Sequence, residues 1–161
     1  MTFRPLNQTD FKTIDRWLCE PHIKVAWGNE VFTEPYEKYI FRTGDKSVLQ
    51  YIIEIESVSI GYFQYYWASK VGDGWWDGFD EHTVGVDFYV GKSNYLGLGL
   101  GSEIIRAAKT MLFANPKINR IIADPSLENK KIIYLLGESG FVAEGEIDTP
   151  DGRALFMYVR K

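Results

Sequence analysis

Residues 95–105 read YLGLGLGSEII, and this stretch decides how the rest of the chain is interpreted. Glycine stands at alternate positions, Gly97, Gly99 and Gly101, between an extended run and an apolar helical pattern. A simple strand-to-helix turn needs one glycine, so three indicate that the backbone comes close to a ligand. Free N–H groups at the start of a helix, together with the helix dipole, favour a phosphate or pyrophosphate. The stretch therefore predicts an anion-binding turn.

The turn differs from two common phosphate-binding motifs. No Gly-Lys-Ser/Thr sequence follows the glycines, so the Walker pattern is missing. The dinucleotide fingerprint also fails, because the glycine spacing is wrong and the preceding strand is not the first of a βαβ series. The anion site must belong to another kind of domain.

The segments on either side of the turn predict a mixed α/β domain on a largely antiparallel sheet. Residues 83–91, TVGVDFYVG, are rich in β-branched and aromatic side chains, as in a central strand, and residues 102–114 have helical apolar spacing. Further strands are expected at residues 2–5, 47–55, 59–67 and 119–124, with two more around a TPDG turn in residues 141–160. Further helices are expected from about residue 10 to 18, at 32–42 and at 127–140. About seven strands and four helices then form one domain over residues 1–161.

Composition limits the partners and the compartment. The single cysteine, Cys19, excludes a disulfide within the chain and fits a reducing, cytoplasmic compartment. No apolar run is long enough to span a membrane. With 18 basic against 22 acidic residues, a net charge of −4 and no basic stripe, nucleic acid is not an expected partner and cations are favoured.

Residues 72–81, GDGWWDGFDE, combine carboxylates with large aromatic rings. A Gly- and Asp-rich segment is often only a turn whose aromatic side chain folds onto the core, and this stays open for Trp75 and for Trp76 taken singly. Two adjacent rings among carboxylates nevertheless supply π faces and negative charge, which together hold a cation. The segment predicts a binding loop for a positively charged molecule.

Several segments, in order along the chain, resemble a known family. The G-x-G-x-G-S turn, its apolar helix, the N-x-x-x-I pattern and the GF before the next strand are similar to GCN5-related N-acetyltransferases over essentially the whole chain. WLCEPHIKVAWG, IGYFQYY, GDGWW, GVDFYVG, YLGLGLG, ADPS and TPDGRALFM resemble the aminoglycoside 6'-N-acetyltransferase branch. The resemblance implies the GNAT fold, acetyl-CoA as acetyl donor and direct transfer to the 6'-amine of a cationic aminoglycoside in a ternary complex, by a monomer or homodimer.

The resemblance also implies roles for particular residues. Asp87 is expected to receive or orient the amine; from the residues alone, an Asp between Val86 and Phe88 in a buried strand is costly without a partner or a task. The expected donor-binding residues are Phe88, Tyr89, Val90, Leu96, Gly97, Leu98, Gly99, Leu100, Gly101, Ser102 and Asn129. The expected wall of the amine pocket is Trp27, Gln64, Tyr66, Asp73, Trp75, Trp76, Asp124 and Asp151.

The sequence departs from the family at two positions. Leu96 stands where a Gln or Arg is usual, and Leu136 stands where most members have a Tyr that protonates the leaving thiolate. Tyr134 lies two residues earlier, which on a helix is about 200° away. Either solvent protonates the thiolate, or the protein works differently from the branch.

Other functions remain possible from the sequence. The same chemistry can serve a siderophore precursor, a polyamine or a protein N-terminus, although siderophore-type relatives usually carry a His where this chain has Asp87. The missing Tyr also permits a module that binds acyl-CoA without turnover. No metal site is expected, because His22 and His82 are the only histidines and no HExxH context accompanies them.

Overall fold

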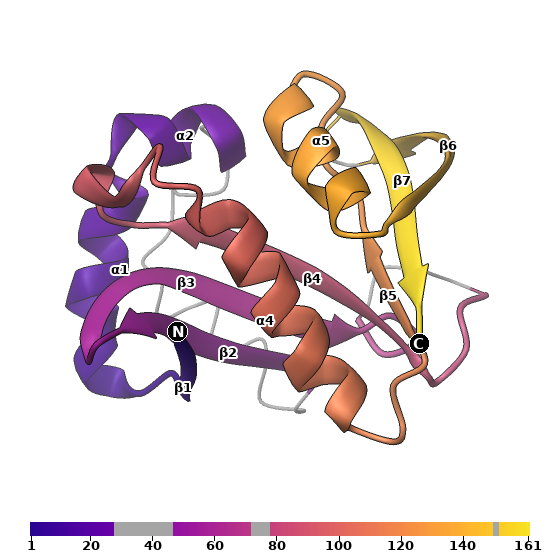
Figure 1. The fold of residues 1–161 in the computed structure, drawn as a ribbon, viewed down its shortest axis with the longest axis horizontal. Coiled ribbons are helices and arrows are strands. Elements are labelled where there is room, and N and C mark those ends of the chain that lie inside the picture. Colours follow the sequence, from indigo (N-terminus) through magenta and orange to yellow (C-terminus); the bar gives the residue numbers. More distant parts are fainter. Residues whose placement is uncertain (28–46, 72–77, 150–151) are drawn as a thin grey trace. The chain divides into compact units, whose positions relative to one another are not determined.

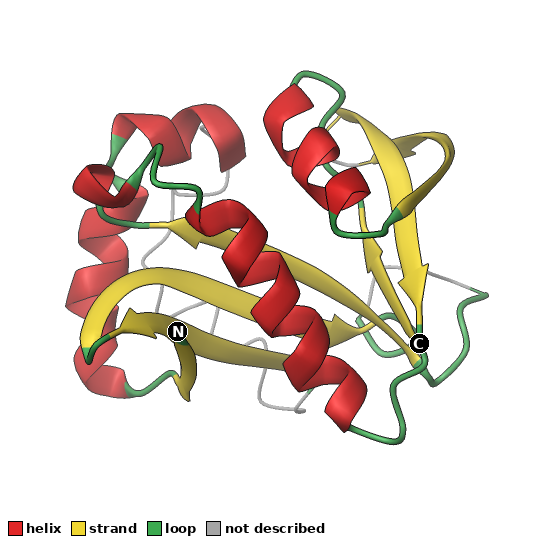
Figure 2. Cartoon of the chain, in the orientation of Figure 1, coloured by secondary structure: helices red, strands yellow, loops and turns green. Residues whose placement is uncertain are grey.

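The computed structural model describes residues 1–27, 47–71, 78–149 and 152–161. Their strands form a seven-stranded mixed sheet in the order β1-β2-β3-β4-β5-β7-β6, with β4 and β5 parallel (Figures 1 and 2). The chain divides into two compact units, one of residues 1–65 and 87–98 and the other of residues 66–86 and 99–161. Strands β3 and β4 each contribute residues to both units.

The first unit begins with β1 (Thr2–Pro5), the 3-10 helix η1 (Gln8–Asp10), α1 (Phe11–Leu18) and α2 (Pro21–Trp27). Strands β2 (Val48–Ile55) and β3 (Val58–Trp67) follow, joined by a two-residue turn. Glu56 and Ser57 in that turn both have positive φ, 48° and 65°, as in the tight turns that suit the twist of a hairpin. The end of β4 (Thr83–Val90) and the 3-10 helix η2 (Ser93–Tyr95) complete the unit.

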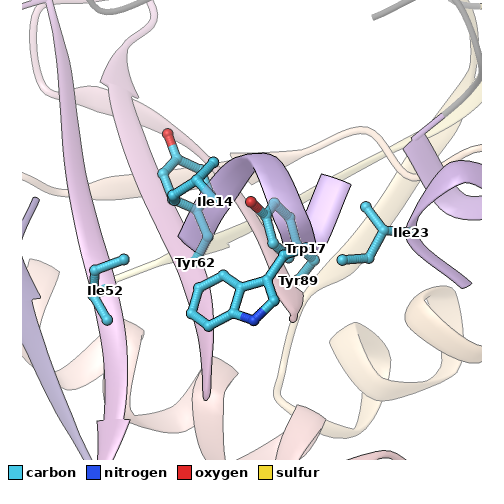
Figure 3. Packing of buried hydrophobic residues seen from close by; sticks show 6 residues of the cluster. All are labelled: Ile14, Trp17, Ile23, Ile52, Tyr62 and Tyr89. Carbon is cyan, nitrogen blue, oxygen red and sulfur yellow. The ribbon is translucent and has the colours of Figure 1, made fainter. Parts of the chain in front are cut away.

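Aromatic and branched side chains from α1, α2 and three strands form a core in this unit (Figure 3). Helix α1 contributes Ile14 and Trp17, both buried, because these positions lie three apart on one face. The Trp17 ring meets Tyr89 of β4 edge-on at 6.4 Å, and Tyr89 stacks on Tyr62 of β3 at 5.3 Å. The face of the sheet that carries Tyr62 and Tyr89 is therefore fixed by the packing of α1.

An ion-pair network ties β1 to the start of α1. Arg4 donates two hydrogen bonds to the Asp10 carboxylate, at 2.9 and 3.0 Å, and a third to Glu54 of β2 at 2.9 Å. Burial raises the pKa of Asp10, but the hydrogen bonds from Arg4 and from the Asn7 N–H, with the charge of Arg4, outweigh burial and lower it. The network thus favours the ionised carboxylate of the folded protein.

We expect this network to make stability depend on pH. Because the pKa of Asp10 is lower in the folded chain, its contribution is complete above the unfolded value of about 3.9 and is lost as the pH falls below it. Arg4→Met should cost about 1–2 kcal/mol at pH 7 and less at pH 3, measured by urea unfolding at both values. Lys12→Met, which removes an equal charge elsewhere on the same unit, is the control. An equal loss at both pH values for Arg4→Met would contradict the role of this pair.

The second unit contains the start of β4, α4 (Leu100–Ala114), β5 (Arg120–Ala123), α5 (Lys130–Glu138), β6 (Val142–Thr149) and β7 (Gly152–Arg160). Thr83, Val84 and Gly85 of β4 pair in parallel with residues 120–122 of β5, and β5 pairs antiparallel with β7. Helices α4 and α5 contact one another, and Ile104, Leu112 and Leu136 are fully buried. This unit therefore holds the helix that follows the glycine turn.

Strand β6 lies at one edge of the sheet and pairs only with β7 among the described strands. Its exposed residues Glu144, Glu146 and Asp148 alternate along the strand, and the register shifts between Ala143 and Gly145. The edge is therefore both acidic and irregular.

The predicted fold class is confirmed, with one difference in detail among the described residues. The sequence did not predict α2 as a separate helix, although Pro21 at its first position is a usual start signal. The helix expected at residues 32–42 lies outside the described residues. None of the described helices is long and apolar enough to cross a membrane.

Candidate functional site

The glycine turn leads from η2 into α4 and is drawn as a loop in Figure 2. Gly97 and Gly99 both have φ of +77°, which side-chain-bearing residues rarely adopt, and no described atom lies within 4 Å of where their Cβ atoms would be. Gly99 caps α4 without a side chain, so the first N–H groups of the helix have no partner inside the helix and no capping side chain. The turn thus has the donor set and the open space that a phosphate requires.

Gly101 differs from Gly97 and Gly99 in its surroundings, because a side chain there would meet another helix. It lies inside α4, and a Cβ there would come within 2.7 Å of the Leu135 Cδ1 atom of α5. The sequence grouped it with Gly97 and Gly99 as a site of ligand approach. In the structure its small size also leaves room for the end of the Leu135 side chain, and its approach to a ligand stays a prediction.

Asp87 lies half-buried on β4 and is held by a neighbouring strand. Gln64 Nε2 donates a hydrogen bond of 2.8 Å to Asp87 Oδ2, and Tyr62 Oη donates one of 2.7 Å to Gln64 Oε1. The partner that the sequence analysis required for this carboxylate is therefore present. The structure brings together two predicted site residues, Asp87 and Gln64, and adds Tyr62, which the sequence had not singled out.

Several predicted donor-binding residues have structural contacts of their own. The Tyr89 side chain is buried in the core of the first unit, so only its backbone is left for a ligand. The Val90 carbonyl lies 2.9 Å from His22 Nε2, and the side chain of Asn129 caps α5 by accepting from the Ile132 N–H at 3.3 Å. These contacts fix the end of β4 in the first unit and the start of α5 in the second.

The predicted residues of the amine pocket are distributed over both units. Tyr66 is buried in the second unit, and its ring occupies the space beside Gly85, where a Cβ would lie within 2.1 Å of it. Asp124 follows the end of β5 in the same unit, and Trp27 is the last residue of α2. Four predicted residues, Asp73, Trp75, Trp76 and Asp151, lie outside the described residues.

The last residues of the acidic segment, which the structure describes from residue 78 on, are fixed by contacts that the sequence did not predict. Phe79 lies 5.0 Å from the Arg120 guanidinium and 5.7 Å from the Phe156 ring. Asp80 accepts hydrogen bonds of 2.9 Å from the Thr83 hydroxyl and from the His82 N–H. The bond from Thr83, more than any other cause, lowers the pKa of Asp80. The sequence carried no local signal for this cluster, because β5 has no aromatic residue and the rings near Arg120 belong to Phe79, Phe156 and Tyr158 in other segments.

The position of the family's tyrosine is occupied by a core residue. The Leu136 side chain is 2% exposed, whereas Tyr134 on the same helix is 65% exposed. The predicted difference in direction between these two side chains is confirmed. Neither residue therefore presents a phenol to the interior of this unit.

We expect Leu136→Tyr to destabilise the protein rather than to supply an acid. A larger, polar side chain at a fully buried position should cost about 1–3 kcal/mol, because the packed core must move and the hydroxyl needs a partner. Urea unfolding measures the cost, and turnover should not rise. Tyr134→Phe, which removes an exposed phenol, should change neither quantity. A Leu136→Tyr protein of full stability and higher turnover would show that the position still accepts an acid.

Within the described residues, no group of three or more His, Cys, Asp or Glu side chains is placed to hold a metal ion. The one cysteine, Cys19, is exposed at the end of α1 and is a free thiol. On β4, the carboxylate of Asp87 has a close and defined partner, the side-chain amide of Gln64.

The mixed sheet with a parallel β4–β5 pair, and the glycine turn that opens α4, fit the fold that the resemblance implied, and the comparisons identify the family. The family model described as "Acetyltransferase (GNAT) domain" matches residues 7–149, so the chain belongs to the GNAT acetyltransferase family. It is 34% identical to the aminoglycoside N(6')-acetyltransferase type 1 of Klebsiella pneumoniae, over 98% of this chain and 81% of that protein.

Solved structures give the same result. A structure of AAC(6')-Ib in complex with paromomycin and acetyl-CoA has a TM-score of 0.92 and 34% identity, over 99% of this chain and 93% of that one. A structure of the same protein with coenzyme A and kanamycin has a TM-score of 0.91 and 33% identity, over 99% and 94% of the two chains. The protein is thus a GNAT acetyltransferase with the predicted fold.

Proposed function

We propose that this acetyltransferase transfers the acetyl group of acetyl-CoA to the 6'-amine of an aminoglycoside. The observation that carries the proposal is the similarity to an aminoglycoside N(6')-acetyltransferase along 98% of the chain. The half-buried Asp87 carboxylate, fixed by Gln64, supports it, since a fixed negative group is what an ammonium-bearing substrate needs.

We assign the binding site of the acetyl donor, acetyl-CoA, to the glycine turn. The open left-handed positions Gly97 and Gly99, with the free N–H groups of the first turn of α4, fit a pyrophosphate. Acetyl-CoA supplies an activated acetyl group as a thioester. Leu96, Leu98, Leu100 and Ser102 surround the same turn, and Phe88 and Val90 contribute backbone from the end of β4.

The residues of this chain have a small set of tasks in the transfer. Asp87 orients the amine and accepts the proton that the nitrogen loses as its bond to the acetyl carbon forms. Solvent protonates the leaving thiolate, because Leu136 is buried and Tyr134 points outward. Asp124 and the acidic segment that contains Asp73 hold the other ammonium groups of the substrate.

A thiol-release assay tests this function. The panel should contain a matched pair of aminoglycosides that differ only in an amine or a hydroxyl at the 6' position, together with spermidine and lysine. We expect release of coenzyme A with the 6'-amine compound and about background release with the 6'-hydroxyl compound. Turnover with spermidine or lysine and none with either aminoglycoside would overturn the proposed substrate.

We also expect the two substrates to respond differently to salt. Attraction between a polycation and several carboxylates is screened as the Debye length falls from about 10 Å at 0.1 M salt to about 3 Å at 1 M. The KM for the amine should rise roughly fivefold or more over that range, and the KM for acetyl-CoA should change less. Steady-state kinetics at several salt concentrations measure both. Equal sensitivity of the two constants would count against a carboxylate-lined amine site.

A further inference from the structure

Three polar side chains of the first unit form one chain of hydrogen bonds. Tyr62 and Gln64 lie two residues apart on β3 and so share a face of the sheet, and Asp87 lies on β4. The hydroxyl of Tyr62 donates to Gln64 Oε1 at 2.7 Å, and Gln64 Nε2 donates to Asp87 Oδ2 at 2.8 Å. We infer that Gln64 is a positioning residue for Asp87, and that the hydrogen bond from Tyr62 holds the Gln64 side chain in place. This inference rests on the proposed role of Asp87 in acetyl transfer.

The chemistry of the amide permits one arrangement. A glutamine side chain has an oxygen that accepts and a nitrogen that donates, and an ionised carboxylate only accepts. With the Tyr62 proton directed at Oε1, the Nε2 group faces Asp87, and both bonds form. A reversed amide would set its oxygen against the carboxylate oxygen, although the phenol oxygen could still accept from its nitrogen. The ionised Asp87 carboxylate therefore decides which end of the amide faces it, and the Tyr62 hydroxyl holds the other end of the amide in place.

The start of this chain is anchored in the core. Tyr62 is 2% exposed and stacks on Tyr89 with an interplanar angle of 23°, and Tyr89 meets Trp17 at 86°. Figure 3 shows these three rings among the aliphatic side chains of the cluster. A hydroxyl on a packed ring has little freedom to move, and hydrogen bonds in a chain at low dielectric reinforce one another. The packing of α1 against these rings therefore helps to fix the position of Asp87 Oδ2, through Tyr62 and Gln64.

This arrangement changes the role expected for Gln64. The sequence placed it in the wall of the amine pocket, where its loss would raise the KM for the amine and leave kcat nearly unchanged. A residue that holds Asp87 acts on the reacting geometry instead, so its loss lowers kcat and leaves the KM for the amine nearly unchanged. The two roles therefore differ in a measurable way.

A double-mutant cycle with a matched control tests the inference. The variants are Gln64→Met, which keeps the length of the side chain, Tyr62→Phe, which removes one hydroxyl, and the two combined. Tyr65→Phe is the control, because Tyr65 is on the same strand, is also buried and stacks on Tyr51 on the opposite face. Each protein is assayed for kcat, for both KM values and for thermal unfolding, with the amine that the wild type acetylates best.

We expect Gln64→Met to lower kcat about tenfold and Tyr62→Phe about three- to fivefold, each with the amine KM within about twofold of the wild type. The double variant should be no slower than Gln64→Met, because in this arrangement the effect of the hydroxyl on Asp87 passes through the amide. Tyr65→Phe should change kcat by less than about twofold. If Tyr62→Phe fails to fold, the division between kcat and KM in Gln64→Met still decides the role of Gln64.

Three results would overturn the inference: multiplicative effects in the double variant, a raised amine KM with unchanged kcat in Gln64→Met, or an equal loss of kcat in Tyr65→Phe. Failure of the proposed function is separate, since it shows as a wild type that acetylates another amine and no aminoglycoside. In that case the double-mutant cycle is measured with the amine that the wild type acetylates.

Discussion

Asp87→Asn should lower kcat by about 10²- to 10⁴-fold, the usual cost of losing a positioned base. The substitution keeps the shape of the side chain and leaves an oxygen that can accept from Gln64, so only the negative charge and the basic oxygen are removed. The thermal unfolding midpoint should stay close to that of the wild type. Steady-state kinetics with the amine substrate, together with calorimetry of acetyl-CoA binding, measure the effect.

The control for this change is Asp148→Asn on β6. Asp148 has a side chain that is 95% exposed, and it forms an ion pair of 4.0 Å with Arg153. Asp148→Asn removes the same charge from β6, a strand that contains none of the predicted site residues, and kcat should not change. If Asp87→Asn kept turnover within about threefold of the wild type, Asp87 could not be the group that receives the proton.

Gly99→Val should weaken acetyl-CoA binding at least about tenfold, which corresponds to about 1.4 kcal/mol. The residue has φ of +77°, where a β-branched side chain is strained, and it immediately precedes the free N–H groups of α4. The valine would either move the turn away from its present form or fill the space that a phosphate needs. Isothermal calorimetry with acetyl-CoA measures the loss.

Substitutions at two other glycines serve as controls that distinguish backbone strain from a loss of acetyl-CoA binding. Gly140→Val has the same kind of strain, at φ of +87°, beyond the end of α5, and should lower stability without changing the affinity for acetyl-CoA. Gly101→Ala should change stability by no more than about 1 kcal/mol, because the end of the Leu135 side chain can move aside and alanine is the better helix former. The assignment of acetyl-CoA to this turn would be wrong if its dissociation constant were unchanged in Gly99→Val. It would also be wrong if Gly140→Val weakened acetyl-CoA binding by the same factor.

Local sequence patterns predicted most of the fold. The apolar spacing of α4 and the β-branched runs of β3 and β4 depend only on neighbouring residues, and these elements were confirmed. Helix α2 was missed because its seven residues are too few for a clear period. The resemblance added the family, which the comparisons confirm.

Contacts between segments far apart in the chain could not be predicted in the same way. Gln64 and Asp87 are 23 residues apart, and their hydrogen bond depends on the register between two strands. The role of Gly101 likewise depends on where Leu135 of another helix lies. A spaced-glycine motif does not by itself separate glycines that face a ligand from those that face a helix. The roles of Asp73, Trp75, Trp76 and Asp151 stay predictions.

The edge strand β6 has a consequence for how copies of the molecule can meet. Two such edges brought side by side would face each other with rows of carboxylates, at Glu144, Glu146 and Asp148, and with a ladder interrupted at Gly145. Like charges directly opposite one another repel, and a shifted ladder leaves donors without matching acceptors. Ion pairs with Arg120 and Arg153 offset part of this charge, but an acidic and irregular edge still disfavours the growth of a continuous sheet from one molecule into the next across β6.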